Sequence, residues 1–318
     1  MLRKIKIFGM AVAFLCATSI AGQVSAAAPE SKDPVKIAIN DWTSQYIQSY
    51  IVGGMLDRMG YNVEYVQADP MAQFPGFESG DLHMQVEIWP TSQSELVAAS
   101  VATGTVIKMG ELGMAAKESW WYPTYMEETC PGLPKWEALR DCAELFAAPE
   151  TAPMGRYLGG PVTWAGNDEE RAEAFGLEFE VIHAGTEAAI WAELASAYQR
   201  KAAFIGWLWV PHWWPVKYDG KFIDFPTYEA ACYTDASWGV NPDKTHDCAK
   251  PAGVLSKLAW AGGDEKFPMA WQAFRNYVMD VKTLGGLIAA VDLDGGDPQE
   301  VAEKWLNENE AIWTPWTK

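Results

Sequence analysis

The sequence has 318 residues, of which 49% are hydrophobic, and a formal net charge of -18 at pH 7. A chain of this length can bury the cores of two lobes. Its acidity disfavours nucleic acid and anionic membranes as partners, because both are negatively charged themselves.

The first 26 residues are predicted to be a secretory signal peptide. Arg3, Lys4 and Lys6 precede an apolar run over 7–15, and a small-residue cleavage signal ends at Ala26. The apolar run is too short to be a transmembrane anchor. We therefore expect a soluble mature chain in the periplasm, still more acidic than the full sequence.

The segment after the signal peptide is predicted to alternate strands with helices. A β-branched strand over 35–40 precedes a helix whose apolar positions recur at helical spacing and which ends at Gly60. Strands follow over 61–66 and 82–89, with a short helical segment near 72–79 between them. This alternation predicts a mostly parallel sheet covered by helices on both faces.

Four cysteines remain after the signal peptide, an even number in an oxidising compartment. Three pairings are possible, and proximity along the chain favours disulfides Cys130–Cys142 and Cys232–Cys248. Each short loop would contribute roughly 3 kcal/mol in the chain-entropy model. Metal ligation is the alternative, but the spacings match no zinc pattern.

The β/α rhythm pauses in loops near 130–134 and 148–153 and then restarts. The later predicted elements are strands near 157–164, 178–183 and 203–210, and helices near 187–200, 269–284 and 298–309.

Two α/β lobes account for this order of elements. We expect lobe 1 to comprise residues 27–115 plus 225–318, and lobe 2 to comprise residues 116–224. The chain would cross between them near 110–117 and 220–228, and a ligand cleft would lie between the lobes.

Common catalytic and nucleotide-binding motifs are absent from the sequence. It has no G-x-S-x-G, no Walker loop, no H-E-x-x-H and no G-x-G-x-x-G. The acidic stretch from Asp292 lacks the distal glutamate of an EF-hand, and Asp297 before Pro298 is typical of a helix N-cap. We therefore expect no catalytic residues, no cofactor and no metal.

Tryptophan is the remaining candidate for binding chemistry. Trp42, Trp89, Trp164 and Trp209 lie at predicted strand ends, where α/β sheets bind ligands. Singly, each is more often a core residue. Together they can form an aromatic box for a methylated ammonium group, each contact contributing roughly 0.5–2 kcal/mol. Glu87 precedes Trp89 by two residues on the same strand face, and it is either the cation's complement or an ordinary solvated or salt-bridged residue.

The segments around these tryptophans resemble the substrate-binding proteins of ABC importers for glycine betaine, choline and trimethylamine N-oxide. The resemblance extends from about Val35 to Trp313. Trp209-Val210-Pro211-His212-Trp213 resembles the family's W-x-P-x-W segment, whose first tryptophan is a cage wall. The segments ending in Trp89 and Trp164 resemble those that supply two further walls, and Trp42 matches an aromatic residue used by some members.

The resemblance implies a type II periplasmic-binding-protein fold whose lobes close over the ligand. It also implies an ABC permease and its ATPase as partners, and we expect a monomer. No basic residue follows Trp89 to hold a ligand carboxylate, and no aspartate follows Trp42 as in choline binders. These differences favour trimethylamine N-oxide, with glycine betaine and choline as alternative ligands.

Three other interpretations are open at this point. A sugar receptor would also use tryptophan, but it would need more polar donors near the indoles than the sequence offers. A periplasmic enzyme acting on methylated amines would need a cofactor or an activated nucleophile. An adhesive interaction module would expose its indoles and bind no small molecule.

Overall fold

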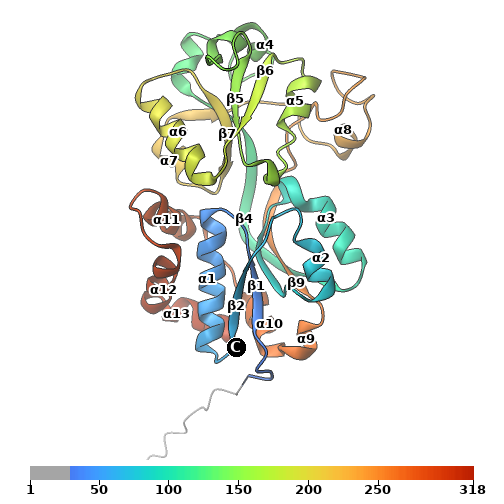
Figure 1. Cartoon of the computed structure of the whole chain (residues 1–318), viewed down its shortest axis with the longest axis vertical. Helices are drawn as coiled ribbons and strands as arrows, with labels where there is room; N and C mark the ends of the chain where they lie inside the picture. The colour runs from blue at the N-terminus through green and yellow to red at the C-terminus, as the bar shows by residue number, and fades with distance from the viewer. Residues whose placement is uncertain (1–28) are drawn as a thin grey trace, which may run out of the picture.

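The computed structural model describes residues 29–318, so the predicted signal peptide over 1–26 lies outside the described residues. The chain forms two halves stacked along its long axis, each with its own part of the β-sheet (Figure 1). Within the described residues, no helix is both long and apolar enough to cross a membrane.

The first half is built on five strands. In spatial order they are β2 (Val63–Gln67), β1 (Val35–Ile39), β3 (Met84–Ile88), β9 (Gly253–Trp260) and the first part of β4 (Val106–Pro123). Strand β1 is parallel to β2 and β3, whereas β9 is antiparallel to both of its neighbours.

Helices from both ends of the chain surround these strands. They are α1 (Thr43–Arg58), α2 (Phe74–Ser79), α3 (Pro90–Ala102), α9 (Gly263–Lys266), α10 (Pro268–Asn276), α11 (Val281–Asp292), α12 (Pro298–Glu308), α13 (Glu310–Trp313) and η4 (Thr314–Thr317). Asp297 caps α12 as predicted, because its Oδ1 accepts the backbone N–H groups of Gln299 (2.9 Å) and Glu300 (3.0 Å).

The second half has the strand order β4-β7-β5-β6, with β8 (Gly220–Phe222) paired to the end of β4. Its other strands are β5 (Gly155–Gly159), β6 (Phe179–His183) and β7 (Ile205–Val210), and β5 is parallel to both β6 and β7. The helical segments are η1 (Thr124–Glu128), α4 (Ala138–Cys142), η2 (Ala143–Phe146), η3 (Val162–Trp164), α5 (Asp168–Ala174), α6 (Glu187–Gln199), α7 (Trp214–Lys217) and α8 (Ala230–Thr234).

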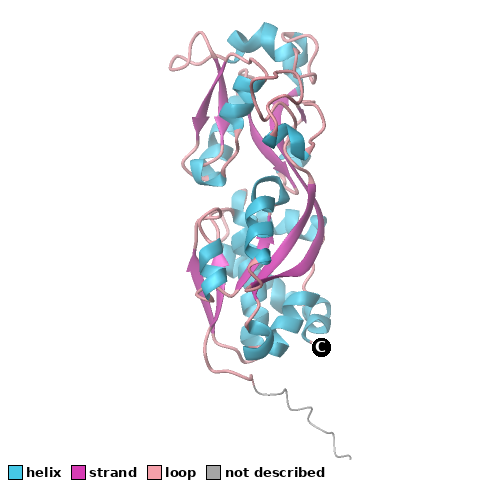
Figure 2. Cartoon of the chain, turned by 90° about the vertical axis from the view of Figure 1, so that its right-hand side faces the viewer, coloured by secondary structure: helices cyan, strands magenta, loops and turns pink. Residues whose placement is uncertain are grey.

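Strand β4 joins the two halves without interruption. Its residues Val106 to Ala116 pair with β9, and Lys117 to Trp121 pair with β7. Figure 2 shows the long strands passing from one half into the other. The partner of β4 changes between Ala116 and Lys117, so this point is one of the two places where the chain crosses between the halves; the other lies between β8 and β9.

Both favoured disulfides are present. Cys130 and Cys142 have Cα atoms 5.7 Å apart, and Cys232 and Cys248 have Cα atoms 6.3 Å apart, which are ordinary separations for bonded cysteines. The second disulfide closes a segment that packs on α5 of the second half before the chain enters β9. Asn241 Nδ2, for example, donates to the Ala174 carbonyl at 3.1 Å.

Two expectations about secondary structure were wrong. The sheet is mixed rather than mostly parallel, because β4 and β9 run antiparallel to the strands that flank them. The helix expected over 269–284 is two helices, α10 and α11. Asp280 caps the second helix by accepting Thr283 N–H (2.9 Å), so a new helix begins where the periodicity indicated continuity.

Candidate ligand-binding site

A small cavity lies where the two halves meet, and the four tryptophans singled out in the sequence line it. Trp89 follows β3 directly and Trp42 lies three residues after the end of β1, and they are the N-cap residues of α3 and α1. Trp164 ends η3 after β5, and Trp209 lies in β7. Each half therefore contributes two indoles. The remaining lining residues are Pro70, Ser92, Gln93 and Glu118.

The indoles meet edge to face. The ring centroids of Trp42 and Trp164 are 5.7 Å apart with an interplanar angle of 80°, and those of Trp164 and Trp209 are 5.6 Å apart at 76°. Perpendicular packing is a favourable arrangement for aromatic pairs. All four indoles also line the same cavity, as an aromatic box requires.

Glu87 lies behind the box rather than among the lining residues of the cavity. Its Oε1 accepts hydrogen bonds from Trp42 Nε1 (2.8 Å), Trp89 Nε1 (2.7 Å) and Ser44 Oγ (2.8 Å). Gln48 donates to the other carboxylate oxygen. Glu87 and Trp89 do share a side of the strand, but the carboxylate meets the N–H edges of the indoles. Glu87 therefore holds two indoles of the box in position and, within residues 29–318, is neither solvated nor salt-bridged; whether it also complements a bound cation stays a prediction.

The backbone of Trp89 is held as firmly as its ring. Gln93, one turn into α3, accepts the Trp89 backbone N–H at 2.9 Å through Oε1. Its amide nitrogen donates to the Pro70 carbonyl at 3.0 Å. Gln93 thereby links the backbone of Trp89 to Pro70, so three lining residues of this wall are connected by hydrogen bonds.

Glu118 is the one ionisable residue that lines the cavity. It lies on β4 directly opposite Trp209 of β7, so the two side chains share a face of the sheet. Its Oε2 is buried and has no hydrogen-bond partner among the described residues. Burial raises the pKa of this carboxyl, although Lys250 opposes the shift. Glu118 can therefore carry a proton and donate it in a hydrogen bond.

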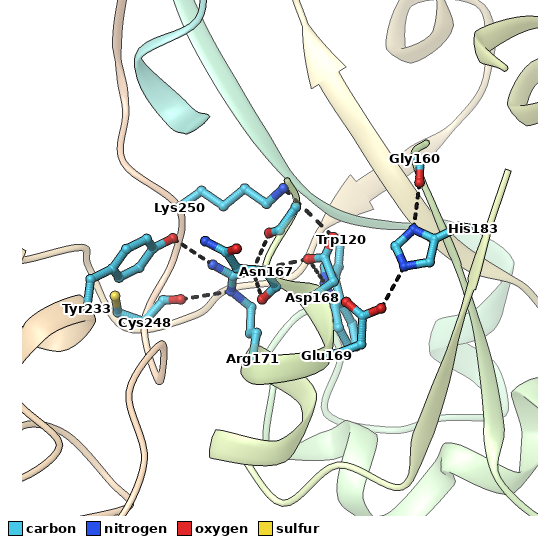
Figure 3. Close-up of polar contacts among 11 residues, drawn as sticks. Trp120, Gly160, Asn167, Asp168, Glu169, Arg171, His183, Tyr233, Cys248 and Lys250 are labelled. Carbon is cyan, nitrogen blue, oxygen red and sulfur yellow. Dashed lines mark hydrogen bonds and ion pairs between the residues drawn. The ribbon is translucent and has the colours of Figure 1, made fainter. Parts of the chain in front are cut away.

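A buried charge network supports the second half of the cavity (Figure 3). Asp168 Oδ1 accepts from Trp120 Nε1 (2.8 Å) and from Arg171 (3.0 Å). Arg171 also donates to Tyr233 Oη (2.9 Å) and to the Cys248 carbonyl (3.0 Å). The guanidinium thus fastens both ends of the disulfide-closed segment to α5.

Lys250 links this network to the cavity wall. Its Nζ is 3.8 Å from Asp168 Oδ2 and 3.3 Å from the centroid of the Trp207 ring. Trp207 in turn packs edge-on against the cavity tryptophan Trp164, with ring centroids 6.0 Å apart. The amino group is buried and faces Asp168 and an indole, an arrangement that combines an ion pair with a cation–π contact.

The sequence reasoning missed Glu118 because its position depends on strand pairing. A signal was nonetheless present: Glu118 and Ser119 directly precede the aromatic run Trp120-Trp121-Tyr122, just after the expected crossing at 110–117. A carboxylate at the start of a buried strand needs a partner, a proton or a ligand.

The fold and this cavity define a two-halved binding protein with a four-indole cage between α/β units. The chain belongs to the family described as the substrate binding domain of ABC-type glycine betaine transport systems, whose model it matches over residues 33–308. It is thus a substrate-binding protein of the ABC importers for glycine betaine, choline and trimethylamine N-oxide. Proteins of this family serve transport rather than catalysis.

Individual relatives agree with this assignment. The chain is 33% identical to the trimethylamine N-oxide-binding protein of Pelagibacter ubique, over 97% of this chain and 98% of the relative. Its fold is similar to the glycine betaine, L-proline-binding protein ProX of Borrelia burgdorferi (TM-score 0.71, 19% identity, 89% and 96% of the two chains). It is also similar to lactococcal OpuAC complexed with glycine betaine in its closed conformation (TM-score 0.70, 16% identity, 90% and 100%).

Proposed function

We propose that this protein captures trimethylamine N-oxide in the periplasm and delivers it to an ABC permease and its ATPase. The observation that carries the proposal is Glu118, a buried carboxyl that lines the cavity beside the four indoles and has one oxygen without a hydrogen-bond partner among residues 29–318. A box of this kind suits a small guest that is apolar and cationic at one end and a hydrogen-bond acceptor at the other.

The two ends of trimethylamine N-oxide match the two kinds of wall. Its three methyl groups spread the positive charge of the nitrogen and cannot donate strong hydrogen bonds, so ring faces bind them well. Its oxide is a strong acceptor and needs a donor. A protonated Glu118 supplies that donor, and burial favours the protonated form by raising the pKa of the carboxyl.

The same lining disfavours ligands that carry a carboxylate. The lining residues other than the indoles are Pro70, Ser92, Gln93 and Glu118, so no lysine, arginine or histidine is among them. A glycine betaine carboxylate would have no cationic partner and would meet Glu118 instead. The relative from Pelagibacter ubique, which is named for trimethylamine N-oxide binding, supports the same choice.

Energetics are sufficient for capture from dilute solution. Three or four contacts of roughly 0.5–2 kcal/mol each, together with one hydrogen bond to a charged group, can reach the approximately 8 kcal/mol of a micromolar complex.

We further propose that the two lobes comprise residues 27–115 plus 225–318 and residues 116–224. In this assignment the segment with α8 and the second disulfide, which lies beside the second half, counts as part of lobe 1 and packs on lobe 2 (Figure 1). The protein acts as a monomer after removal of residues 1–26.

Isothermal titration calorimetry tests the proposal. Ligands should include trimethylamine N-oxide, glycine betaine, choline, carnitine and dimethylsulfoniopropionate, and trimethylamine N-oxide is expected to bind most tightly. Trp89→Ala, Trp164→Ala and Trp209→Ala should each weaken binding at least tenfold with far-UV circular dichroism retained. Trp238→Ala, outside the cavity lining, is the control. Unchanged affinity in the three cavity variants would refute the cage, and tighter binding of glycine betaine or choline would reassign the ligand.

A further inference from the structure

Three ionisable side chains meet outside the cavity, at a second contact between the two halves. Glu187 is the first residue of α6, and His212 follows β7, so both belong to the second half. Asp292 is the last residue of α11 in the first half. One side-chain N or O atom from each of the three lies within 4.8 Å of the others. Figure 1 places α11 and α1 in one half, below α6 and α7 in the other.

Two hydrogen bonds cross between the halves at this cluster. The backbone N–H of Thr43, at the start of α1, donates to Glu187 Oε2 at 2.6 Å. From the other side, Trp213 Nε1 donates to Asp292 Oδ2 at 2.7 Å. Thr43 Oγ1 donates to Asp292 Oδ1 at 2.7 Å and so connects the two carboxyl groups. Separating the halves would break both crossing bonds.

His212 lies between the carboxyl groups. Its Nε2 is 3.8 Å from Glu187 Oε1 and 3.5 Å from Asp292 Oδ2, beyond ordinary hydrogen-bond length, and it has no hydrogen-bond partner among the described residues. The imidazole stacks on Trp191 (4.2 Å, 24°) and meets the cage wall Trp209 edge-on (5.3 Å, 63°). The cluster is therefore in direct contact with the cage.

The hydrogen bonds of the imidazole favour a proton over a metal ion at this point. Nδ1 of His212 accepts the Trp214 backbone N–H at 3.2 Å, which assigns the proton of the neutral ring to Nε2. A metal ion at Nε2 would need the opposite tautomer, in which Nδ1–H is a donor. We therefore interpret the cluster as a site that holds protons.

Two carboxylates this close, and buried, cannot both ionise without cost. Burial, and then the neighbouring Asp292, raise the pKa of Glu187 from 4.5 to about 8, even though the N-terminus of a helix favours a carboxylate. Burial lowers the pKa of His212, so the imidazole supplies no positive charge near neutral pH. The side chains of Thr43, Trp191 and Trp213, which also face the cluster, are uncharged. Lys217 lies over the Trp213 ring at 5.6 Å.

We propose that Glu187, His212 and Asp292 form a proton-dependent latch that holds the two halves in the closed, ligand-binding arrangement, with one proton taken up at this cluster on closing. In this role they are positioning residues, because they act on the cage through the contact of the halves and through Trp209. The latch rests on the proposed function in one respect: trimethylamine N-oxide, the proposed ligand, is the probe in the titration below.

The sign of the pH effect follows from the change at Glu187. In separated halves its carboxyl would face water with the ordinary pKa of 4.5, whereas in the closed form the pKa is about 8. The closed form therefore binds more protons between these values. Affinity should fall by up to about tenfold for each unit that the pH rises from 4.5 to 8, with the full slope where the ligand-free halves are apart, and should become level above 8.

The experiment is a calorimetric titration with trimethylamine N-oxide between pH 6 and pH 9 for the wild type, Glu187→Gln and the exposed control Glu180→Gln. A glutamine at 187 keeps the shape of the protonated acid and can donate to Asp292. We expect Glu187→Gln to bind at least tenfold more tightly than the wild type at pH 8, with a pH slope shallower by about one decade per unit. Asp292→Asn should flatten the slope as well, and Glu180→Gln should follow the wild type. A Glu187→Gln variant with the wild-type slope overturns the latch.

Two further measurements separate the latch from the identity of the ligand. Small-angle X-ray scattering of the ligand-free protein should give a smaller radius of gyration at pH 6 than at pH 9 for the wild type, and a small radius at both values for Glu187→Gln. This result supports the latch even if none of the methylated amines binds, and an unchanged radius in both proteins overturns it. Tighter ligand binding on addition of Zn²⁺, reversed by a chelator, would overturn it in favour of a metal site.

Discussion

Replacement of Glu118 gives the sharpest test of how the cavity distinguishes an N-oxide from other methylated amines. The Oε2 atom of Glu118 is buried and has no hydrogen-bond partner in the described part of the chain, so a ligand oxide would form its hydrogen bond with a largely desolvated carboxyl. A hydrogen bond that involves a charged group contributes roughly 1.5–3 kcal/mol. Loss of the bond in Glu118→Ala should therefore weaken trimethylamine N-oxide binding about 10- to 150-fold.

Glu118→Gln and tetramethylammonium complete this test. The glutamine amide keeps a donor, so the variant should retain trimethylamine N-oxide affinity to within about tenfold of the wild type. Tetramethylammonium has a methyl group in place of the oxide and cannot accept a hydrogen bond. At a pH where Glu118 is protonated, Glu118→Ala should therefore bind tetramethylammonium as tightly as the wild type does.

The pH dependence has a definite sign. Burial raises the pKa of Glu118, and the proton that the oxide needs is lost as the pH rises through that value. The affinity for trimethylamine N-oxide should therefore fall with rising pH, while that for tetramethylammonium should rise. Titrations in a Glu187→Gln background isolate this contribution. Equal trimethylamine N-oxide affinity in the wild type and Glu118→Ala would refute the reasoning.

Three predictions concern the supports of the site. Glu87→Ala should lower trimethylamine N-oxide affinity at least tenfold and lower the melting temperature, because two indole N–H groups lose their acceptor. Glu87→Gln still offers an acceptor oxygen, so its affinity and its melting temperature should fall less. Replacing Cys232 and Cys248 by serine should cost roughly 3 kcal/mol, measured by urea unfolding, with faster hydrogen exchange confined to the segment between them. Lys257→Met should cost roughly 1–3 kcal/mol in the same assay, because the buried amino group donates to three carbonyls at the end of α10. An unchanged free energy of unfolding would show that these three hydrogen bonds do not stabilise the fold.

The sequence contained the local information for the cage but not the pairing that completes it. Trp42, Trp89 and Trp209 could be placed because a strand pattern ends at each of them, and the structure brings all three to one cavity. Glu118 could not be placed, because its neighbour is fixed by the register of β4 against β7, across about 90 residues of intervening chain.

Glu87 shows the limit of periodicity in a different way. The period of two correctly put it on the side of Trp89, but it could not tell whether the carboxylate faces the ring or the N–H group. That choice depends on α1, whose Ser44 and Gln48 surround the carboxylate with further donors. Likewise, the position of β9 between β3 and β4 depends on pairing with strands far earlier in the sequence, and no local pattern indicated it.

The double hydrogen bond from two indoles to one carboxylate has a consequence for the order of events in capture. Trp42, Trp89 and Glu87 all belong to the first half, so these bonds survive when the halves move apart. Trp42 and Trp89 therefore keep their positions in the ligand-free protein. A solute can bind to these two indoles before the halves close and bring Trp164 and Trp209 into contact with it. Such preorganisation reduces the ordering entropy lost on binding, and it suits a scavenger that must hold a very small guest.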